Sequence, residues 1–177
     1  MKKKIKLIPN HGILFWVTGL SGSGKTRISK KISSHIRKNY GKTLVLSGDE
    51  IRNIFNMKGY SNKERLITVL KYCKLAKKIT SQNINVILAV IGMRDYLRDW
   101  NKKNQKNYVE IYIKTDLQKI IKKGKKRIYH QNKDNIIGLD IKAENPKNPH
   151  IILHNKFEKN INFYSSDLMA KIKKYLN

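Results

Sequence analysis

A glycine-rich stretch near the start of the chain limits most strongly what this sequence can fold into. Residues 19–26 read Gly-Leu-Ser-Gly-Ser-Gly-Lys-Thr and fit the phosphate-binding pattern G-x-x-x-x-G-K-[ST]. The apolar run Gly12-Ile-Leu-Phe-Trp16 precedes this stretch, and a helix-like run, Lys25–Asn39, begins at its end. A strand, a glycine loop and a helix in this order predict an α/β domain that holds a nucleotide phosphate at the helix N-terminus.

The rest of the chain alternates strand-like apolar runs with helix-like amphipathic runs. Strands are expected at Ile13–Thr18, Thr43–Ser47, Asn85–Ile91, Tyr108–Lys114 and Ile151–His154. Helices are expected at Lys25–Asn39, Asn62–Ser81, Arg94–Lys103, Leu117–Lys123 and Ser166–Leu176, the last within a C-terminal helix placed at about 165–177. This alternation favours a three-layer fold of the P-loop NTPase type, with a central parallel sheet of about five strands flanked by helices. Because the 177 residues contain no repeat or low-complexity linker, residues 1–177 are expected to form a single domain.

The expected helix at 62–81 carries the clearest local signals. Ser61 and Glu64 form the S-x-x-E pattern of a capping box. Apolar residues then recur at helical spacing and are expected in the core: Leu66, Val69, Leu70, Cys73, Ala76 and Ile79. Cys73 is the only cysteine, so no intrachain disulfide can form, and its position predicts burial rather than reactivity.

The chain is strongly basic, with 39 Lys and Arg against 12 Asp and Glu and a net charge of +27. Nucleic-acid binding is one explanation of such an excess. However, the lysines are spread over nearly every expected surface, and no ladder of alternating aromatic and basic residues is visible. We therefore interpret the excess as general surface charge that attracts an anionic substrate, and we expect no specific nucleic-acid partner.

The sequence contains no sign of membrane insertion or secretion. No apolar run approaches the ~20 residues that a membrane span requires. The charged start, Met1-Lys-Lys-Lys-Ile-Lys6, is followed by Pro9, Asn10 and His11 rather than by an apolar segment and a cleavage site. A cytoplasmic protein without a membrane partner is therefore expected.

The glycine loop indicates a nucleotide substrate and its metal ion. Its glycines allow consecutive backbone N–H groups to turn toward one anion, and the following helix adds the positive end of its dipole. Lys25 is expected to bridge the β- and γ-phosphates of ATP, and the Thr26 hydroxyl to hold Mg²⁺. The residues expected to bind ATP are Gly19, Leu20, Ser21, Gly22, Ser23, Gly24, Lys25 and Thr26.

A second motif follows the second expected strand: Leu46-Ser-Gly-Asp49-Glu-Ile-Arg52. The carboxyl ends of strands carry the ligand crevice in open α/β sheets. Asp49 could there order the magnesium ion or accept the proton of an acceptor hydroxyl. One helical turn would bring Arg52 to the same crevice. Taken alone, Asp49 could equally cap the next helix, but beside a phosphate loop the catalytic interpretation is favoured.

These motifs, in this order, resemble those of the adenylylsulfate kinases. That family typically reads Gly-Leu-Ser-Gly-x-Gly-Lys, then Asp-Gly-Asp-x-x-Arg, then Phe-Ser-x-x-Asp-Arg. Here the chain has residues 19–26, Ser47-Gly-Asp49-Glu-Ile-Arg52 and Tyr60-Ser-Asn-Lys-Glu64-Arg65. The most specific match is late in the chain, where Gly138-Leu-Asp140-Ile-Lys-Ala-Glu144-Asn-Pro146-Lys-Asn-Pro149-His-Ile-Ile-Leu153 is similar to the family's Gly-Ile-Asp-x-x-x-Glu-x-Pro-x-Asn-Pro-x-Ile-x-Leu. The resemblance covers about residues 12–155.

The resemblance implies a kinase that uses ATP and Mg²⁺ to phosphorylate the ribose 3′-hydroxyl of adenosine 5′-phosphosulfate, giving 3′-phosphoadenosine 5′-phosphosulfate. It implies that Lys25 and Asp49 are catalytic residues. Asp49 would face the acceptor hydroxyl, and Asp49 and Thr26 together would hold the metal ion.

The resemblance also implies an acceptor-binding set. It places Arg52 and Arg65 on the acceptor's sulfate and phosphate, Tyr60 on its base and Ile91 in the acceptor site. Arginine forks suit oxyanions and an aromatic face suits a purine, although Tyr60 could also be a packing residue. Members of the family are commonly dimers, so a homodimer is a further expectation.

Three departures from the family pattern concern the acceptor. Gly92 stands where the family has a serine that is often regarded as a phosphoserine intermediate, so no covalent intermediate can form at that position. Thr68 replaces an asparagine. In the expected lid, Lys123-Gly124 replaces Arg-Asp, Ile128-Tyr129 replaces Leu-Tyr and His130-Gln131 replaces a lysine pair. Lys125, Lys126 and Arg127 could supply the missing charge or could form a solvated helix end.

Two readings therefore compete with the leading one. Arg98-Asp-Trp100-Asn and Tyr108-Val-Glu-Ile-Tyr112 resemble a branch of the family, often encoded with surface-polysaccharide genes, of which at least one member phosphorylates cytidine diphosphoramidate. That nucleotide is the alternative acceptor. A catalytically silent, basic nucleotide- or nucleic-acid-binding module is the alternative from another class, and the retained Asp49, Arg52 and Arg65 argue against it.

Overall fold

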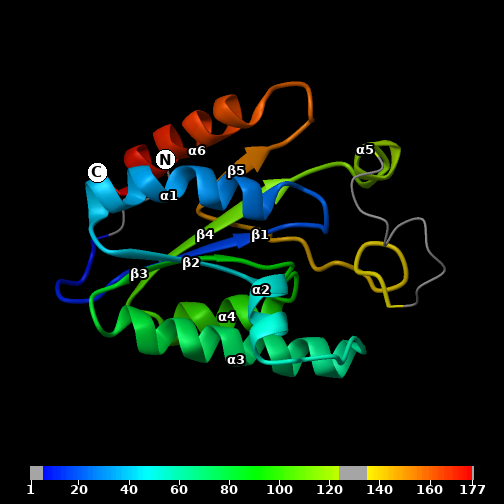
Figure 1. The fold of residues 1–177 in the computed structure, drawn as a ribbon, viewed down its shortest axis with the longest axis horizontal. Helices are drawn as coiled ribbons and strands as arrows, with labels where there is room; N and C mark the ends of the chain where they lie inside the picture. The colour runs from blue at the N-terminus through cyan, green and yellow to red at the C-terminus, as the bar shows by residue number, and fades with distance from the viewer. Residues whose placement is uncertain (1–5, 124–134, 177) are drawn as a thin grey trace.

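A parallel sheet of five strands forms the centre of the fold (Figure 1). The structure is a computed structural model that describes residues 6–123 and 135–176. The strands are β1 (Ile13–Thr18), β2 (Thr43–Ser47), β3 (Asn85–Ala89), β4 (Asn107–Lys114) and β5 (Ile151–His154). They lie in the order β2-β3-β1-β4-β5, and every pairing is parallel. All residues of β1 and β3 are buried, as expected for strands covered on both faces.

Helices cover both faces of this sheet (Figure 1). On one face α1 (Lys25–Tyr40) packs against α6 (Ile161–Leu176), and on the other face α3 (Asn62–Thr80) packs against α4 (Asp95–Asn104). Two short helices, α2 (Gly48–Ile54) and α5 (Leu117–Lys122), follow the carboxyl ends of β2 and β4. The predicted three-layer arrangement is confirmed. Among the described residues, none of the helices has the length and apolar character of a membrane span.

Alternating side chains of the central strand build the two cores. Phe15 and Val17 contribute to the core beneath α1 and α6. Leu14 and Trp16 contribute to the core beneath α3 and α4, which also contains the fully buried Cys73. The predicted burial of this cysteine is confirmed, and desolvation raises the pKa of its thiol to about 12.

One helix was missed, and two predicted boundaries are wrong by two residues or more. The sequence analysis did not place α2, although Ser47 and Glu50 form a capping box at its start. The C-terminal helix begins at Ile161 rather than at 165 or 166, since the Asn160 side chain accepts a hydrogen bond from the Phe163 backbone N–H at 3.0 Å.

The third strand ends at Ala89 rather than at Ile91. The Thr18 hydroxyl donates to the carbonyl of Ile91, and Gly92 then turns the chain with a positive φ of 44°. The chain therefore leaves the sheet as soon as it passes the end of β1.

Candidate active site

A single cavity of about 710 Å³ joins the predicted motifs at the carboxyl ends of the strands. One end, here called the loop end, is formed by residues 21–26 of the glycine loop together with Asn155 and Phe157 after β5. The other, here called the arginine end, contains Arg52 from α2, Asn62 and Arg65 from α3, and Arg94 at the start of α4. This is the position at which open α/β sheets bind ligands.

The glycines of the loop are needed for its path. Gly19 lies at the end of β1 with φ 151°, and a Cβ there would come within 2.5 Å of the Ile113 carbonyl oxygen. Gly24 is the N-cap of α1 with a left-handed φ of 93°. A side chain at either position would strain or displace the loop that turns its backbone toward the cavity.

Lys25 lies in the first turn of α1 and is 8 % exposed. Its ammonium group donates to the Leu20 carbonyl at 2.7 Å, so the side chain folds back over the loop. The predicted ATP-binding residues that line the cavity are Ser21, Gly22, Gly24, Lys25 and Thr26. Gly19, Leu20 and Ser23 belong to the loop but do not line the cavity.

Asn155 is a site residue that the sequence analysis missed. It is buried, and its amide nitrogen donates to the Ser23 carbonyl at 2.9 Å, while its amide oxygen accepts from the Phe157 backbone N–H at 3.0 Å. The ammonium group of Lys123 donates to the Phe157 carbonyl and lies 5.7 Å from the centre of its ring. The available signal was only its position, directly after the last expected strand. Asn155 ties the loop after β5 to the glycine loop.

Asp49 stands in the first turn of α2 and faces the cavity. The cap of this helix is Ser47, whose hydroxyl accepts from the Glu50 backbone N–H, while the Glu50 carboxylate accepts from the Ser47 backbone N–H. The alternative that Asp49 caps the helix is therefore wrong. Hydrogen bonds from Lys30 and Ser47 lower the pKa of the Glu50 carboxylate. Glu50 therefore serves the helix cap and contacts α1, whereas Asp49 lines the cavity.

Arg52 and Arg65 flank the ring of Tyr60. Their guanidinium carbons lie 4.5 Å and 5.1 Å from the ring centre. Arg52 donates to the carbonyls of Met57 and Gly59 at 3.0 and 2.9 Å, and Arg65 donates to those of Tyr60 and Asn135 at 2.7 and 2.9 Å. Both arginines line the cavity, whereas Tyr60 does not.

The two arginines are close enough to affect each other. Desolvation lowers the pKa of Arg65, and the positive charge of Arg52 lowers it further. Among the described residues, no carboxylate lies within ion-pair distance of either guanidinium. Hydrogen bonds from Ser61 and the charge of Arg52 lower the pKa of the nearby exposed Glu64 carboxylate, which makes no ion pair with Arg52. Two neighbouring guanidinium groups that form no ion pair with a described carboxylate make a site suited to oxyanions.

Apolar side chains line the wall between the two ends: Leu66, Val69, Tyr72, Val90, Ile91 and Leu97. Gly92 adjoins this wall, and a Cβ there would lie 2.4 Å from Cζ2 of Trp16. The position that carries serine in the family pattern is therefore sterically closed to a side chain in this backbone. Thr68 is buried in α3 and does not line the cavity.

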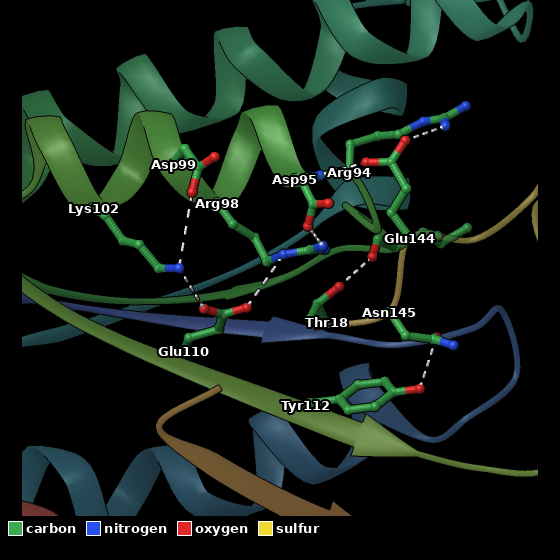
Figure 2. Close-up of polar contacts among 11 residues, drawn as sticks. Thr18, Arg94, Asp95, Arg98, Asp99, Lys102, Glu110, Tyr112, Glu144 and Asn145 are labelled. Carbon is green, nitrogen blue, oxygen red and sulfur yellow. Dashed lines mark hydrogen bonds and ion pairs between the residues drawn. The ribbon is translucent and has the colours of Figure 1, made fainter. Parts of the chain in front are cut away.

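The late motif lies next to the arginine end, where its Glu144 carboxylate accepts a hydrogen bond from Arg94 at 2.8 Å. The Asp140 carboxylate accepts from the Ile136 backbone N–H at 2.8 Å, and Gly138 turns the chain with φ 100°. The Tyr112 hydroxyl of β4 donates to the Asn145 side chain at 3.0 Å, as Figure 2 shows. The motif is thus held against the sheet. Of the replaced lid positions, Lys123 contacts Phe157, whereas Gly124 and residues 128–131 lie outside the described residues, as do Lys125, Lys126 and Arg127.

Comparisons with known proteins agree with this geometry. The adenylylsulphate kinase family model matches residues 11–154. A cytidine diphosphoramidate kinase of Campylobacter jejuni is 35% identical over 86% of this chain and 91% of its own length. A probable adenylyl-sulfate kinase of Aeropyrum pernix is 28% identical over 91% of this chain and 94% of its own.

A solved structure has the same fold. The APS kinase of Mycobacterium tuberculosis, in complex with AMPPNP and APS, superposes with a TM-score of 0.82 at 22% identity, covering 93% of this chain and 99% of its own. The family match extends from the start of β1 to the end of β5 and includes the glycine loop, Asp49, Arg52 and Arg65. The chain therefore belongs to the adenylylsulfate kinase family, and it is a nucleotide-binding P-loop kinase.

Proposed function

We propose that this enzyme transfers the γ-phosphoryl group of ATP to the ribose 3′-hydroxyl of a nucleotide that carries a second anionic group. The observation that supports the proposal is that the glycine loop, Asp49 and the pair Arg52 and Arg65 all line one cavity. A phosphate donor and an anionic acceptor bound at the two ends would meet at Asp49.

The loop end fits ATP. Backbone N–H groups of residues 21–26, the N-terminus of α1 and the Lys25 ammonium group all offer positive charge to the phosphates. Beyond the loop, the aromatic ring of Phe157 and the side chain of Tyr164 line the same end of the cavity. They supply an apolar surface for the base of the nucleotide.

The residues present also fit Mg²⁺. The Thr26 hydroxyl and the Asp49 carboxylate both line the cavity, and both are the oxygen ligands that Mg²⁺ prefers. The part of the chain described here contains no cluster of three His, Cys, Asp or Glu side chains, as suits an ion held mainly by one or two protein oxygens and the phosphates. When bound, the ion neutralises charge on the transferred group.

The chain's own groups suffice for the proton and for positioning. Asp49 would accept the proton of the 3′-hydroxyl as that oxygen attacks, while Lys25 neutralises the β- and γ-phosphates. Arg52 and Arg65 would fix the acceptor's anionic groups, so that the hydroxyl approaches in line. Release of Tyr60 from between the two guanidinium groups would expose its ring to the acceptor's base.

Two acceptors are candidates. We place cytidine diphosphoramidate first, because the relative that uses it is 35% identical, and because Gly92 and Thr68 depart from the usual adenylylsulfate kinase pattern. Adenosine 5′-phosphosulfate, the acceptor that the motifs favour, is second and is supported by the family model and by relatives such as the 28% identical one. Both carry two anionic groups next to the ribose, as the paired arginines require.

A coupled assay of ADP release with each acceptor tests the proposal. Addition of one acceptor should stimulate ADP release by the wild-type protein well above its rate without acceptor, and Lys25→Ala serves as the blank. If neither nucleotide stimulates release, and binding to random oligonucleotides is tight and steeply salt-dependent, the silent binding module is the better account.

Two expectations accompany this proposal. A homodimer is expected from the family resemblance, and sedimentation or size exclusion of the purified protein would test it. A cytoplasmic location is a further expectation, and fractionation of the source cells would test it.

A further inference from the structure

Arg94 is a third arginine at the cavity, and neither the motifs nor the comparisons assign it a role. It precedes α4, its side chain is 19% exposed, and it lines the arginine end. One terminal nitrogen donates to the Glu144 carboxylate at 2.8 Å, and the other donates to the side-chain oxygen of Asn62. Figure 2 shows the arginine and glutamate side chains meeting beside the start of α4.

The contact with Asn62 brings Arg94 close to Arg65, and so to the pair formed by Arg52 and Arg65. Asn62 and Arg65 are three residues apart in the first turn of α3, so they lie on the same face of that helix. Arg94 reaches this face from the segment between β3 and α4 and also lines the cavity. A guanidinium group has five N–H donors, and its two described partners use only part of them.

We propose that Arg94 binds the terminal anionic group of the acceptor, and that Glu144 is the positioning residue that holds it there. This inference rests on the proposed function, because it names a further contact of the same acceptor. The acceptor it implies is a nucleotide with an anionic group at the end farthest from the ribose. This terminal group must offer oxygen atoms to Arg94 in addition to those that Arg52 and Arg65 bind.

Glu144 is built to hold this part of the wall. Helix α4 has no side-chain cap of its own at Arg94, and the Glu144 carboxylate takes that place by accepting from the Asp95 backbone N–H at 2.6 Å. The Glu144 backbone N–H donates to the Met93 carbonyl at 3.1 Å. The hydrogen bond from Asp95 and the contact with Arg94 lower the pKa of Glu144, so it is ionised at neutral pH.

A buried ion-pair chain behind α4 keeps this start of the helix in place. The Asp95 carboxylate contacts Arg98, and Arg98 lies 3.5 Å from the Glu110 carboxylate of β4 (Figure 2). The side chains of Arg98 and Glu110 are only 3% and 1% exposed. Arg94 therefore projects from a firmly anchored helix end, whereas its own guanidinium group remains at the cavity.

The charge balance also favours a ligand role. Glu144 forms an ion pair with Arg94, whereas Arg52 and Arg65 form no ion pair with a described carboxylate. An arginine that only stabilised the fold would not need to line the cavity or to contact Asn62 in the turn that carries Arg65. The Arg94–Glu144 pair offers guanidinium N–H donors to the oxygen atoms of a ligand without adding net charge to the cavity.

Steady-state kinetics with both substrates varied tests the inference. Arg94→Ala should raise the KM for the acceptor roughly 10- to 100-fold, the effect of losing hydrogen bonds to a charged group, with the KM for ATP within about twofold of the wild type. Arg94→Lys keeps the charge but loses the fork, and it should recover part of the loss. Glu144→Gln should raise the acceptor KM less than Arg94→Ala. Arg37→Ala, at the exposed end of α1, is the matched control and should change neither KM.

Binding measurements separate this inference from the proposed function. With the loop end filled by a nonhydrolysable ATP analogue, calorimetry of cytidine 5′-diphosphate binding should show weaker binding to Arg94→Ala than to the wild type. Wild-type turnover with an unchanged acceptor KM in Arg94→Ala overturns the inference and leaves the function standing. Lack of turnover together with Arg94-dependent binding overturns the function and leaves the anion site standing. Equal rises in the KM for ATP and for the acceptor in Arg94→Ala would show a structural role only. The same conclusion would follow if Arg94→Ala failed to fold while Arg94→Lys and Glu144→Gln kept a normal acceptor KM.

Discussion

The two ends of the cavity are built from different parts of the chain. The loop end is made mainly of one continuous segment, the glycine loop between a fully buried strand and a helix, joined by Asn155 and Phe157. The arginine end is made of long side chains from α2, from α3 and from Arg94 directly before α4. The Asn135 carbonyl and the Glu144 carboxylate accept hydrogen bonds from two of these side chains. A continuous backbone loop must keep one conformation to bind the phosphates. Side chains such as Arg52 and Arg65, in contrast, can exchange their carbonyl partners for a ligand. The donor end is therefore generic, and the acceptor end is where members of the family can differ.

The largest effect should come from the loop end. Lys25→Ala removes the only side-chain ammonium group of the loop and should lower turnover roughly 10²-fold or more, by analogy with loss of one oxyanion donor. Its far-UV circular dichroism should match the wild type, because the hydrogen bond from the ammonium group to the Leu20 carbonyl lies within the loop and outside the core. Near-normal turnover in this variant would mean that the loop does not hold the transferred phosphate.

Asp49→Asn probes the point at which the two ends meet. An amide cannot accept the hydroxyl proton, so phosphoryl transfer should fall about 10²-fold or more while ATP still binds. Turnover and ATP affinity are measured on the same preparation. A parallel loss of both would instead indicate that Asp49 supports the loop end alone.

A smaller effect is expected at Gly92, on the acceptor wall. Serine there would hold a left-handed φ of 44° and place its Cβ 2.4 Å from the Trp16 ring. We expect Gly92→Ser to lose about 1–3 kcal/mol of unfolding free energy in urea denaturation and to gain no turnover. Gly41→Ser, at a positive-φ turn with no atom within 4 Å of a Cβ, is the matched control for backbone strain without crowding. A faster and equally stable Gly92→Ser enzyme would contradict the view that this position is closed.

The contrast between the two ends also explains what the sequence could predict. The strands, the layers, the capping box at Ser61 and the loop were predictable, because each depends on neighbouring residues and on hydrophobic periodicity. Asp49, Arg52 and Arg65 were found through motif order, and the structure brings all three to one cavity.

Contacts between distant segments were not predictable in the same way. Asn155 with Ser23, and Glu144 with Arg94 and Asp95, join residues far apart in the chain, and no local pattern encodes them. The position of Tyr60 between two guanidinium groups depends likewise on how α2 and α3 pack. The missed helix α2, only seven residues long, shows that short elements depend on their caps more than on periodicity.

Tracing the γ-phosphoryl group of labelled ATP tests the central claim most directly. In the presence of cytidine diphosphoramidate or adenosine 5′-phosphosulfate, the label should appear on the ribose 3′-oxygen of the acceptor, and the protein should stay unlabelled at all times. This follows because the two ends meet at Asp49 and because Gly92 cannot form a phosphoester. Stoichiometric labelling of the protein that is chased into the acceptor, or release of the label only as inorganic phosphate, would contradict direct transfer between the two ends.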